Sequence, residues 1–360
     1  MKVFHCDHCD NLLFFENTVC LGCRRRVAFL PDLRVMGSLD PDPAAPDLWR
    51  SPLPAAGGRT YRLCRNYRVE EVCNWTVVDG DADLCQSCRL TRVIPDLDVP
   101  GHKLAWYRLE TAKRRLVYSL TAAQLPIATR DEDPLRGLAF EFLADPPGER
   151  GRVLTGHADG VITLNVAEAD DAEREKRRTG LGEPYRTLLG HMRHESGHYY
   201  WDRLIKQDGA VAGFRDVFGD ERQDYGAALS AHYRDGAPAN WRDRFVSAYS
   251  TAHPWEDWAE TWAHYLHILD TLEMAAHCGL RLRPHRRDEP TLPASPPVPG
   301  DGGGPFERVI DSWLPVAYLL NNLSRGLGQP DAYPFVLSPA VIDKLRYVHD
   351  VVQRGARPTP

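Results

Sequence analysis

The chain has 360 residues, enough for two or three domains with at least one sizeable core. With 43% hydrophobic and 26% charged residues, it has the composition of a globular protein, which argues against a disordered chain. The net charge of -6 and the lack of any apolar run of about 18 residues argue against general nucleic-acid binding and against a membrane protein. The N-terminus lacks the apolar segment of a secretory signal, so we expect a cytoplasmic protein with reduced thiols.

The first cysteine set lies at the start of the chain. Two Cys-x-x-Cys pairs are separated by ten residues. Such a pair turns tightly enough for both thiolates to reach one ion, and two pairs complete a tetrahedral four-sulfur site of the zinc-ribbon kind. Two disulfides would need an oxidising compartment, which nothing in the sequence supports. We therefore predict a structural zinc ion bound by Cys6, Cys9, Cys20 and Cys23.

A second cysteine set follows at Cys64, Cys73, Cys85 and Cys88. Only its last two members have the spacing of a zinc knuckle, and the alternatives are buried apolar thiols or a loose redox pair. Four remaining cysteines close together in the sequence favour a second structural zinc, which would contribute folding energy directly to so small a module. The stretch 37–58 is rich in Pro, Ala, Asp and Gly and predicts a linker or a wrapped loop.

After the cysteine region the apolar spacing predicts mainly helices, with two strands among them. The second strand, 161–166, follows a turn at 157–160 and is either an edge along which a substrate adds as a strand or an interior strand. A Pro- and Gly-rich loop at 284–305 is expected to be flexible. The expected elements are helices near 103–125, 184–206, 254–277, 306–323 and 339–353, strands at 139–143 and 161–166, and a helix-rich connection at 212–250.

The segment from His194 to His198 reads His-Glu-Ser-Gly-His and lies within the helix expected from Pro184 to Lys206. Residues four apart share one face of a helix, so both histidines can bind one metal ion. Glu195 can then reach a water held by that ion and act as a general base. Gly197 is costly inside a helix and suggests the close approach of another backbone or of the metal site.

A catalytic zinc site needs a third protein ligand. A histidine ligand six residues after His198 is excluded because that position holds Leu204. On the tryptophan-rich helix that begins near Pro254, Glu256 and Glu260 stand one turn apart on one face. One carboxylate can bind the zinc while the other holds the free ring nitrogen of a ligand histidine, and the sequence leaves open which acid does which.

These motifs resemble the gluzincins, the thermolysin-like clan of metallopeptidases, in which His-Glu-x-x-His precedes a Glu-x-x-x-Asp/Glu segment. The resemblance implies that Glu256 is the third ligand and Glu260 the outer carboxylate. Lethal-factor-like members carry a tyrosine seven residues before the ligand, which corresponds to Tyr249 here. The resemblance therefore makes Tyr249 a candidate oxyanion donor, with competitors Tyr225, Tyr233 and His253.

Nearly the whole chain resembles a bacterial family of zinc-binding metallopeptidases with an N-terminal zinc ribbon. The resemblance rests on the opening cysteine pairs, on Cys85 to Cys88, on the His194 motif and on the segment 254–260. It implies an α+β protein in which a zinc-ribbon region, residues 1–98, precedes a mostly helical zincin-like domain with a small sheet, residues 99–353. It also implies one catalytic and two structural zinc ions and a peptide or protein substrate.

Two rival functions remain open at this point. In the first, the ribbons bind a protein or nucleic acid and the helical domain is a silent scaffold. Residues 1–100 carry 12 Lys and Arg against 14 Asp and Glu, so a protein partner is the better expectation and nucleic acid is disfavoured. In the second, the enzyme is a zinc hydrolase of a small amide, which needs the same site chemistry.

Overall fold

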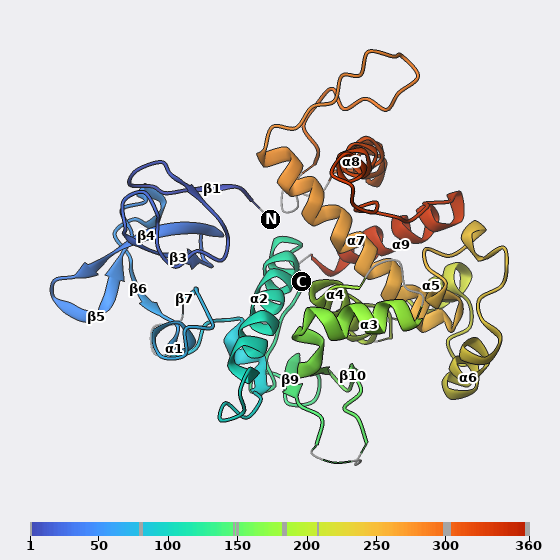
Figure 1. Ribbon diagram of the computed structural model, residues 1–360, viewed down its shortest axis with the longest axis horizontal. Coiled ribbons are helices and arrows are strands. Elements are labelled where there is room, and N and C mark those ends of the chain that lie inside the picture. Colours follow the sequence, from blue (N-terminus) through green and yellow to red (C-terminus); the bar gives the residue numbers. More distant parts are fainter. Residues whose placement is uncertain are drawn as a thin grey trace. The chain divides into compact units, whose positions relative to one another are not determined.

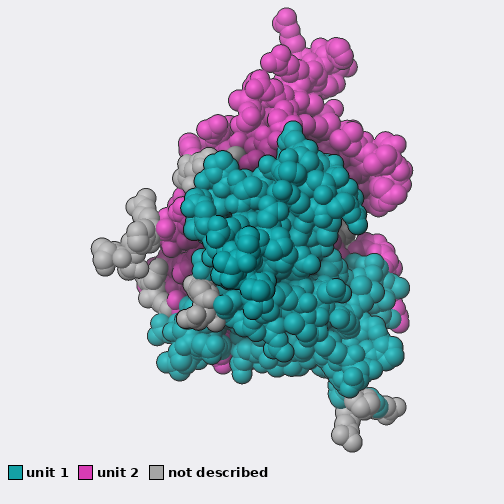
Figure 2. Space-filling model, turned by 90° about the vertical axis from the view of Figure 1, so that its left-hand side faces the viewer, with its two compact units in different colours: residues 1–118, 128–156, 161–174 teal, residues 119–127, 157–160, 175–360 magenta. Residues whose placement is uncertain are grey.

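The computed structural model describes residues 2–78, 82–146, 148, 151–181, 186–206, 209–297 and 304–356 (Figure 1). The chain divides into two compact units, which Figure 2 shows in different colours. Unit 1 comprises Met1–Tyr118, Ala128–Gly156 and Val161–Arg174, and unit 2 comprises Ser119–Ile127, His157–Gly160 and Glu175–Pro360. The α+β class is confirmed, whereas the domain limits at 98 and 353 stay predictions.

Unit 1 begins with a two-stranded antiparallel sheet, β1-β2, followed by a five-stranded antiparallel sheet in the order β3-β4-β5-β6-β7. The prediction of a linker at 37–58 is wrong, because β4 and β5 pair there despite their prolines. A bulge between Pro41 and Asp42 accommodates the irregular pairing. The strands are β1 (Phe4–His5), β2 (Leu12–Leu13), β3 (Arg26–Leu30), β4 (Val35–Asp42), β5 (Ala45–Arg50), β6 (Thr60–Leu63) and β7 (Thr76–Val77), and the short helices are η1 (Pro54–Ala56), α1 (Arg65–Arg68) and η2 (Cys88–Leu90).

A further sheet has four strands in the order β10-β11-β9-β8. β9 runs parallel to both of its neighbours, and Asp159 and Gly160, with φ of 47° and 83°, make the tight turn between β10 and β11. β11 is therefore an interior strand, the second of the two alternatives for 161–166, and β10 takes the edge. The elements are β8 (Thr91–Val93), α2 (His102–Ala122), β9 (Ala139–Leu143), β10 (Gly156–Ala158), β11 (Val161–Asn165), η3 (Val166–Ala169) and α3 (Asp171–Leu181).

Unit 2 is helical. Helix α4 begins at Leu188, because Thr187 caps it by accepting a hydrogen bond from the backbone N–H of Gly190. The predicted start near Pro184 lies outside the described residues. A π-helical turn then continues to Lys206. The helices are α4 (Leu188–Trp201), η4 (Asp202–Lys206), α5 (Val211–Phe218), α6 (Tyr225–Asp235), η5 (Trp241–Asp243), η6 (Tyr249–Thr251), α7 (Pro254–His277), α8 (Phe306–Gly326) and α9 (Pro339–Gly355).

The predicted helices at 254–277, 306–323 and 339–353 correspond to α7, α8 and α9. Pro254 and Pro339 each stand in the first turn of their helix, where a missing N–H costs nothing. Among the described residues, no helix combines the length and apolar character needed to cross a bilayer. The loop predicted at 284–305 lies partly outside the described residues, and its flexibility stays a prediction.

The centre of unit 2 is the contact between α4 and α7. A Cβ atom added at Gly197 would lie 2.9 Å from the Cα atom of Ala259, so the two backbones meet there. Trp258 donates its indole N–H to the carbonyl of Gly197 at 2.8 Å, and Trp262 donates to the hydroxyl of Ser196 at 3.1 Å. The close approach suggested by Gly197 is thus confirmed, and it brings the motif on α4 against α7.

Gly197→Ala is expected to lower the free energy of unfolding by about 1–3 kcal/mol, because the new methyl group overpacks a contact between two backbones. The measurement is the thermal unfolding midpoint of the zinc-loaded protein. Gly213→Ala is the matched control, since a Cβ atom there makes only ordinary contacts of 3.5 Å and 3.6 Å on helix α5. Equal midpoints for the two variants would contradict the close approach.

Candidate metal centres

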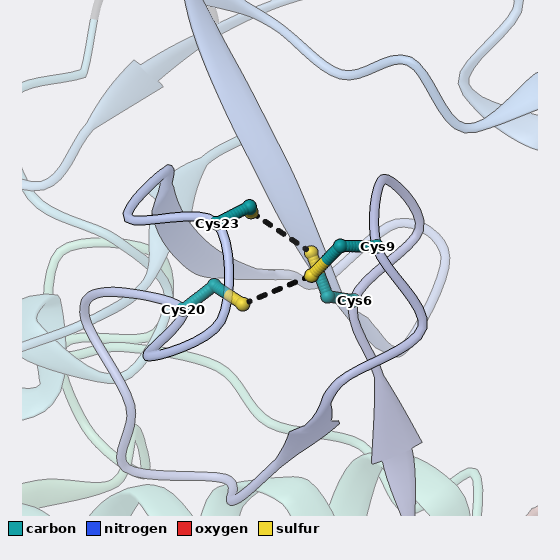
Figure 3. Close-up of side chains that lie close together, drawn as sticks. All are labelled: Cys6, Cys9, Cys20 and Cys23. Carbon is teal, nitrogen blue, oxygen red and sulfur yellow. Dashed lines mark hydrogen bonds between the residues drawn. The ribbon is translucent and has the colours of Figure 1, made fainter.

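The first cysteine site is formed by two similar turns in unit 1 (Figure 3). The Sγ atoms of Cys6 and Cys23 lie 3.8 Å apart, and those of Cys9 and Cys20 lie 3.5 Å apart. Burial raises the pKa of the Cys20 thiol, but the backbone N–H of Cys23 and the neighbouring thiol of Cys9 act against it and bring the pKa to about 7. Burial raises the pKa of Cys6 to about 12, and the pKa of Cys9 is raised too, so Cys20 is the member of the set that readily gives the metal-binding thiolate at near-neutral pH.

The second cysteine site is buried throughout, and its four Sγ atoms lie within 4.8 Å of one another. The pair Cys73 and Cys85 is separated by 3.8 Å. The backbone N–H of Cys85 donates to the Sγ atom of Cys64 at 3.4 Å, and that of Trp75 donates to Cys73 at 3.4 Å. The wide sequence spacing of this set therefore does not prevent it from forming a compact four-sulfur group.

Buried charges on α2 support a metal ion in the second site. Lys113 and Glu110 are fully buried and pair at 2.9 Å, so they neutralise each other. Arg114 is only 2% exposed, and its guanidinium donates to the carbonyl of Val72. Glu110 also acts electrostatically on Arg114, so four neutral thiols would leave two buried cations against one carboxylate, whereas four thiolates around a divalent ion carry a net negative charge. The charge balance therefore favours a metal-bound cysteine set.

The third site lies in unit 2, between α4 and α7. His194, His198 and Glu256 each offer a ligand atom within 4.8 Å of the others, and all three are buried. The Nε2 atom of His194 lies 3.0 Å from Oε2 of Glu256, and that of His198 lies 3.5 Å from Oε1. Two imidazoles and one carboxylate are a usual protein ligand set of a catalytic zinc ion.

The ring of His194 is placed between two carboxylates. Its Nδ1 atom lies 2.7 Å from Oε1 of Glu260. If the neutral ring donates Nδ1–H to Glu260, its bare Nε2 faces Oε2 of Glu256, which is buried and has no hydrogen-bond donor among the described residues. Two lone pairs at 3.0 Å repel each other unless a cation lies between them. The position accordingly requires either a second proton on His194 or a metal ion.

The two histidines are supported differently. Glu260, which braces His194, itself accepts a hydrogen bond from Ser247 at 2.7 Å. Burial raises the pKa of Glu260, but the contact with His194 outweighs it and holds the pKa at about 2. The Nδ1 atom of His198 has no hydrogen-bond partner in the part of the chain that the structure describes, and its ring lies 3.9 Å from the ring of Trp255. A carboxylate orients one ring and an indole the other.

Glu195 follows His194 directly and is 5% exposed, which suits a general base shielded from bulk water. The Nε2 atom of His191 lies 3.7 Å from its carboxylate. On another segment of unit 2, the ring of His157 lies 6.4 Å from that of His198. Four residues of this site were not identified as functional from the sequence: His157, His191, Ser247 and Trp255. Only His191 has a visible signal, because it stands four residues before Glu195.

Two of the candidate oxyanion donors lie beside the third site. The hydroxyl of Tyr225 donates to Oε1 of Glu256 at 2.7 Å, and the ring of Tyr249 lies 6.0 Å from that of His194. Burial and the charge of Glu256 raise the pKa of both phenols, so both remain protonated donors. His253 instead caps α7 by accepting a hydrogen bond from the backbone N–H of Trp255. Tyr233 is 65% exposed.

Comparisons with known proteins bear on the family of the chain. A family model described as "Putative zinc-binding metallo-peptidase" matches residues 102–351, and one described as "zinc-ribbon domain" matches residues 3–99. Uncharacterized proteins of Mycobacterium bovis and of two Mycobacterium tuberculosis strains are each 43% identical over 358 residues, covering 99% of this chain and 96% of theirs. No solved structure matches the chain.

The chain belongs to this family of zinc-binding metallo-peptidases, because the family model covers more than half of it, and it carries the zinc-ribbon domain in front. The resemblance inferred from the sequence is thereby confirmed at the level of the family. The roles of the individual ligands stay predictions.

The three sites predict about three zinc ions per chain. His194→Ala and Glu256→Ala should each lose one ion, and Cys85→Ser should lose a different one, because each variant removes a ligand from one site only. The measurement is zinc content by elemental mass spectrometry after gel filtration. His277→Ala, an exposed histidine at the end of α7, is the control and should keep all ions. Unchanged zinc in both His194→Ala and Glu256→Ala would refute the third site.

Zinc and protons should compete for His194. Burial lowers the pKa of His194, but the two carboxylates outweigh it and raise that pKa well above 6.5. In the metal-free protein this shift stabilises the fold below pH 6.5, and the stabilisation is lost as pH rises through the raised pKa. Zinc affinity of the third site should therefore fall by up to about tenfold for each unit by which the pH is lowered below the pKa of His194. Chelator competition at several pH values measures it, and pH-independent affinity would contradict the competition.

Proposed function

We propose that this protein is a zinc-dependent peptidase whose reaction centre is the group of His194, His198 and Glu256. The single observation that carries the proposal is the cation position between Nε2 of His194 and Oε2 of Glu256, with Glu195 next to it on the same helix. Family membership supports the zinc and the reaction class. The gluzincin-like assignment, with Glu256 as ligand and Glu260 as outer carboxylate, is part of the proposal.

The residues divide the chemistry among them. A zinc ion bound there would supply a Lewis acid that makes water more acidic and polarises the scissile carbonyl. Glu195 accepts the proton of the attacking water and transfers it to the leaving amine. Glu260 fixes the tautomer of His194 through its Nδ1 atom, so that Nε2 remains available to the metal. The reaction is thus hydrolysis of a peptide bond with one general base.

Tyr249 is proposed as the oxyanion donor, with Tyr225 as its rival. Burial and then the charge of the Glu256 carboxylate raise the pKa of both phenols, so both stay protonated, as a hydrogen-bond donor to a developing negative charge must be. The partner of such a donor is the carbonyl oxygen of the substrate. The strand β10 supports a site for that substrate, because it is an edge strand and its His157 lies beside His198.

Two further parts of the proposal concern the surroundings of the enzyme. Leu12, Phe14 and Leu21 are 48%, 65% and 73% exposed and lie in the segment that carries the first cysteine set, which supports a protein partner rather than nucleic acid there. All nine cysteines are free of disulfide bonds, which supports a reducing compartment such as the cytoplasm.

Glu195→Gln is expected to retain the zinc content of the wild type and to lose about 100- to 10,000-fold in kcat, because the amide cannot accept the proton of water. Cleavage of a random peptide library by the zinc-loaded protein, followed by mass spectrometry, measures the activity. Glu141→Gln, which removes a carboxylate from strand β9 and none from the three metal ligands, is the control.

Full activity of Glu195→Gln would refute the mechanism. A zinc-loaded wild type that cleaves no peptide, but binds a protein through residues 1–93, would favour the binding function instead. Cleavage of small amides without cleavage of peptides would favour the small-amide hydrolase.

A further inference from the structure

Helix α6 differs from the other helices of unit 2 that surround the reaction centre. None of its residues, Tyr225 to Asp235, is buried. The segment lies between Gly219 and Gly236, whose φ angles of 102° and 74° are easily adopted only by glycine. An α-helix in a protein draws most of its stability from packing an apolar face, so a helix without a buried face opens at low cost.

Side-chain hydrogen bonds connect this exposed helix to the reaction centre. The hydroxyl of Tyr225, the first residue of α6, donates to Oε1 of Glu256 at 2.7 Å. Near the other end, Nδ1 of His232 lies 3.2 Å from the hydroxyl of Thr251 in η6. The ring of Tyr225 also lies 5.8 Å from the ring of Trp255, at an edge-to-face angle of 77°. A hydrogen bond to a carboxylate is of the stronger kind, so the Tyr225 contact dominates.

We propose that Tyr225 is a positioning residue for the metal ligand Glu256, and that α6, which carries it, is a lid over the metal centre with the Tyr225–Glu256 hydrogen bond as its latch. The lid is defined as residues 224–236, from the helix cap Asp224 to Gly236. The substrate enters when the latch opens.

The geometry at Glu256 explains why the latch affects the metal. Tyr225 occupies Oε1, and the other oxygen, Oε2, is the one without a hydrogen-bond donor among the described residues, facing Nε2 of His194. A donor on one carboxylate oxygen fixes the rotation of the group and presents the second oxygen to the metal. Closing of α6 therefore aligns the ligand, and opening of α6 releases that constraint.

Tyr225→Phe tests both parts, and Tyr233→Phe is the matched control, because Tyr233 is on the same helix with 65% of its surface exposed. Zinc affinity of the third site is measured by chelator competition, with both cysteine sites loaded. Amide hydrogen exchange at saturating zinc is measured by mass spectrometry for residues 224–236 and, as the internal reference, for α7. No substrate is needed for either measurement.

Tyr225→Phe is expected to weaken zinc binding about 10–100-fold, to raise exchange in residues 224–236 several-fold and to leave α7 unchanged, whereas Tyr233→Phe behaves as wild type. Wild-type zinc affinity in Tyr225→Phe would overturn the positioning role. Equal exchange in the two variants, or exchange in wild-type residues 224–236 as slow as in α7, would overturn the lid. The inference rests on the proposed function only for the identity of the entering molecule. If Tyr225→Phe gives the expected results but the wild-type protein cleaves no peptide, the peptidase function is refuted and the lid is still supported.

Discussion

The reaction centre depends on the close contact between α4 and α7 at Gly197. A side chain at this position would collide with the backbone at Ala259. The two helices can lie this close together because residue 197 has no side chain. That distance places His194 between the two acids of α7, one turn apart at Glu256 and Glu260. A ligand site built from facing helices is rigid, because moving any one ligand would require moving a packed helix with its tryptophans.

Buried charge gives the metal ions a structural role at two of the sites. At the second cysteine site, Lys113 and Arg114 share the one buried carboxylate of Glu110, so neutral thiols leave one positive charge in excess. At the third site, either a second proton on His194 or a metal ion has to lie between His194 and Glu256. A divalent ion meets both requirements. Metal binding and folding are therefore coupled in each unit, since each unit contains such a site.

Local patterns in the sequence predicted the features that depend on local geometry. Helical spacing located α7, and the four-residue interval of the histidines follows from the helix itself. The strands in 37–58 form a local hairpin, and they were missed because prolines such as Pro41 and Pro46 are usual in loops. The contacts of Ser247 and Tyr225 with the acids of α7 were outside reach of local patterns, because they depend on how loops and helices return to the site. Only the resemblance to known peptidases favoured Glu256 over Glu260 as the ligand.

The different support of the two histidines has a chemical consequence. Glu260 accepts the Nδ1–H of His194 and makes that ring a stronger, more electron-donating ligand. A second carboxylate behind His198 would add negative charge around the metal position and weaken the pull of a bound cation on the carbonyl of a substrate. The indole of Trp255, 3.9 Å from the ring of His198, orients that ligand without adding charge. The site thus combines two rigid imidazoles with a ligand charge low enough for a metal ion to remain an effective Lewis acid.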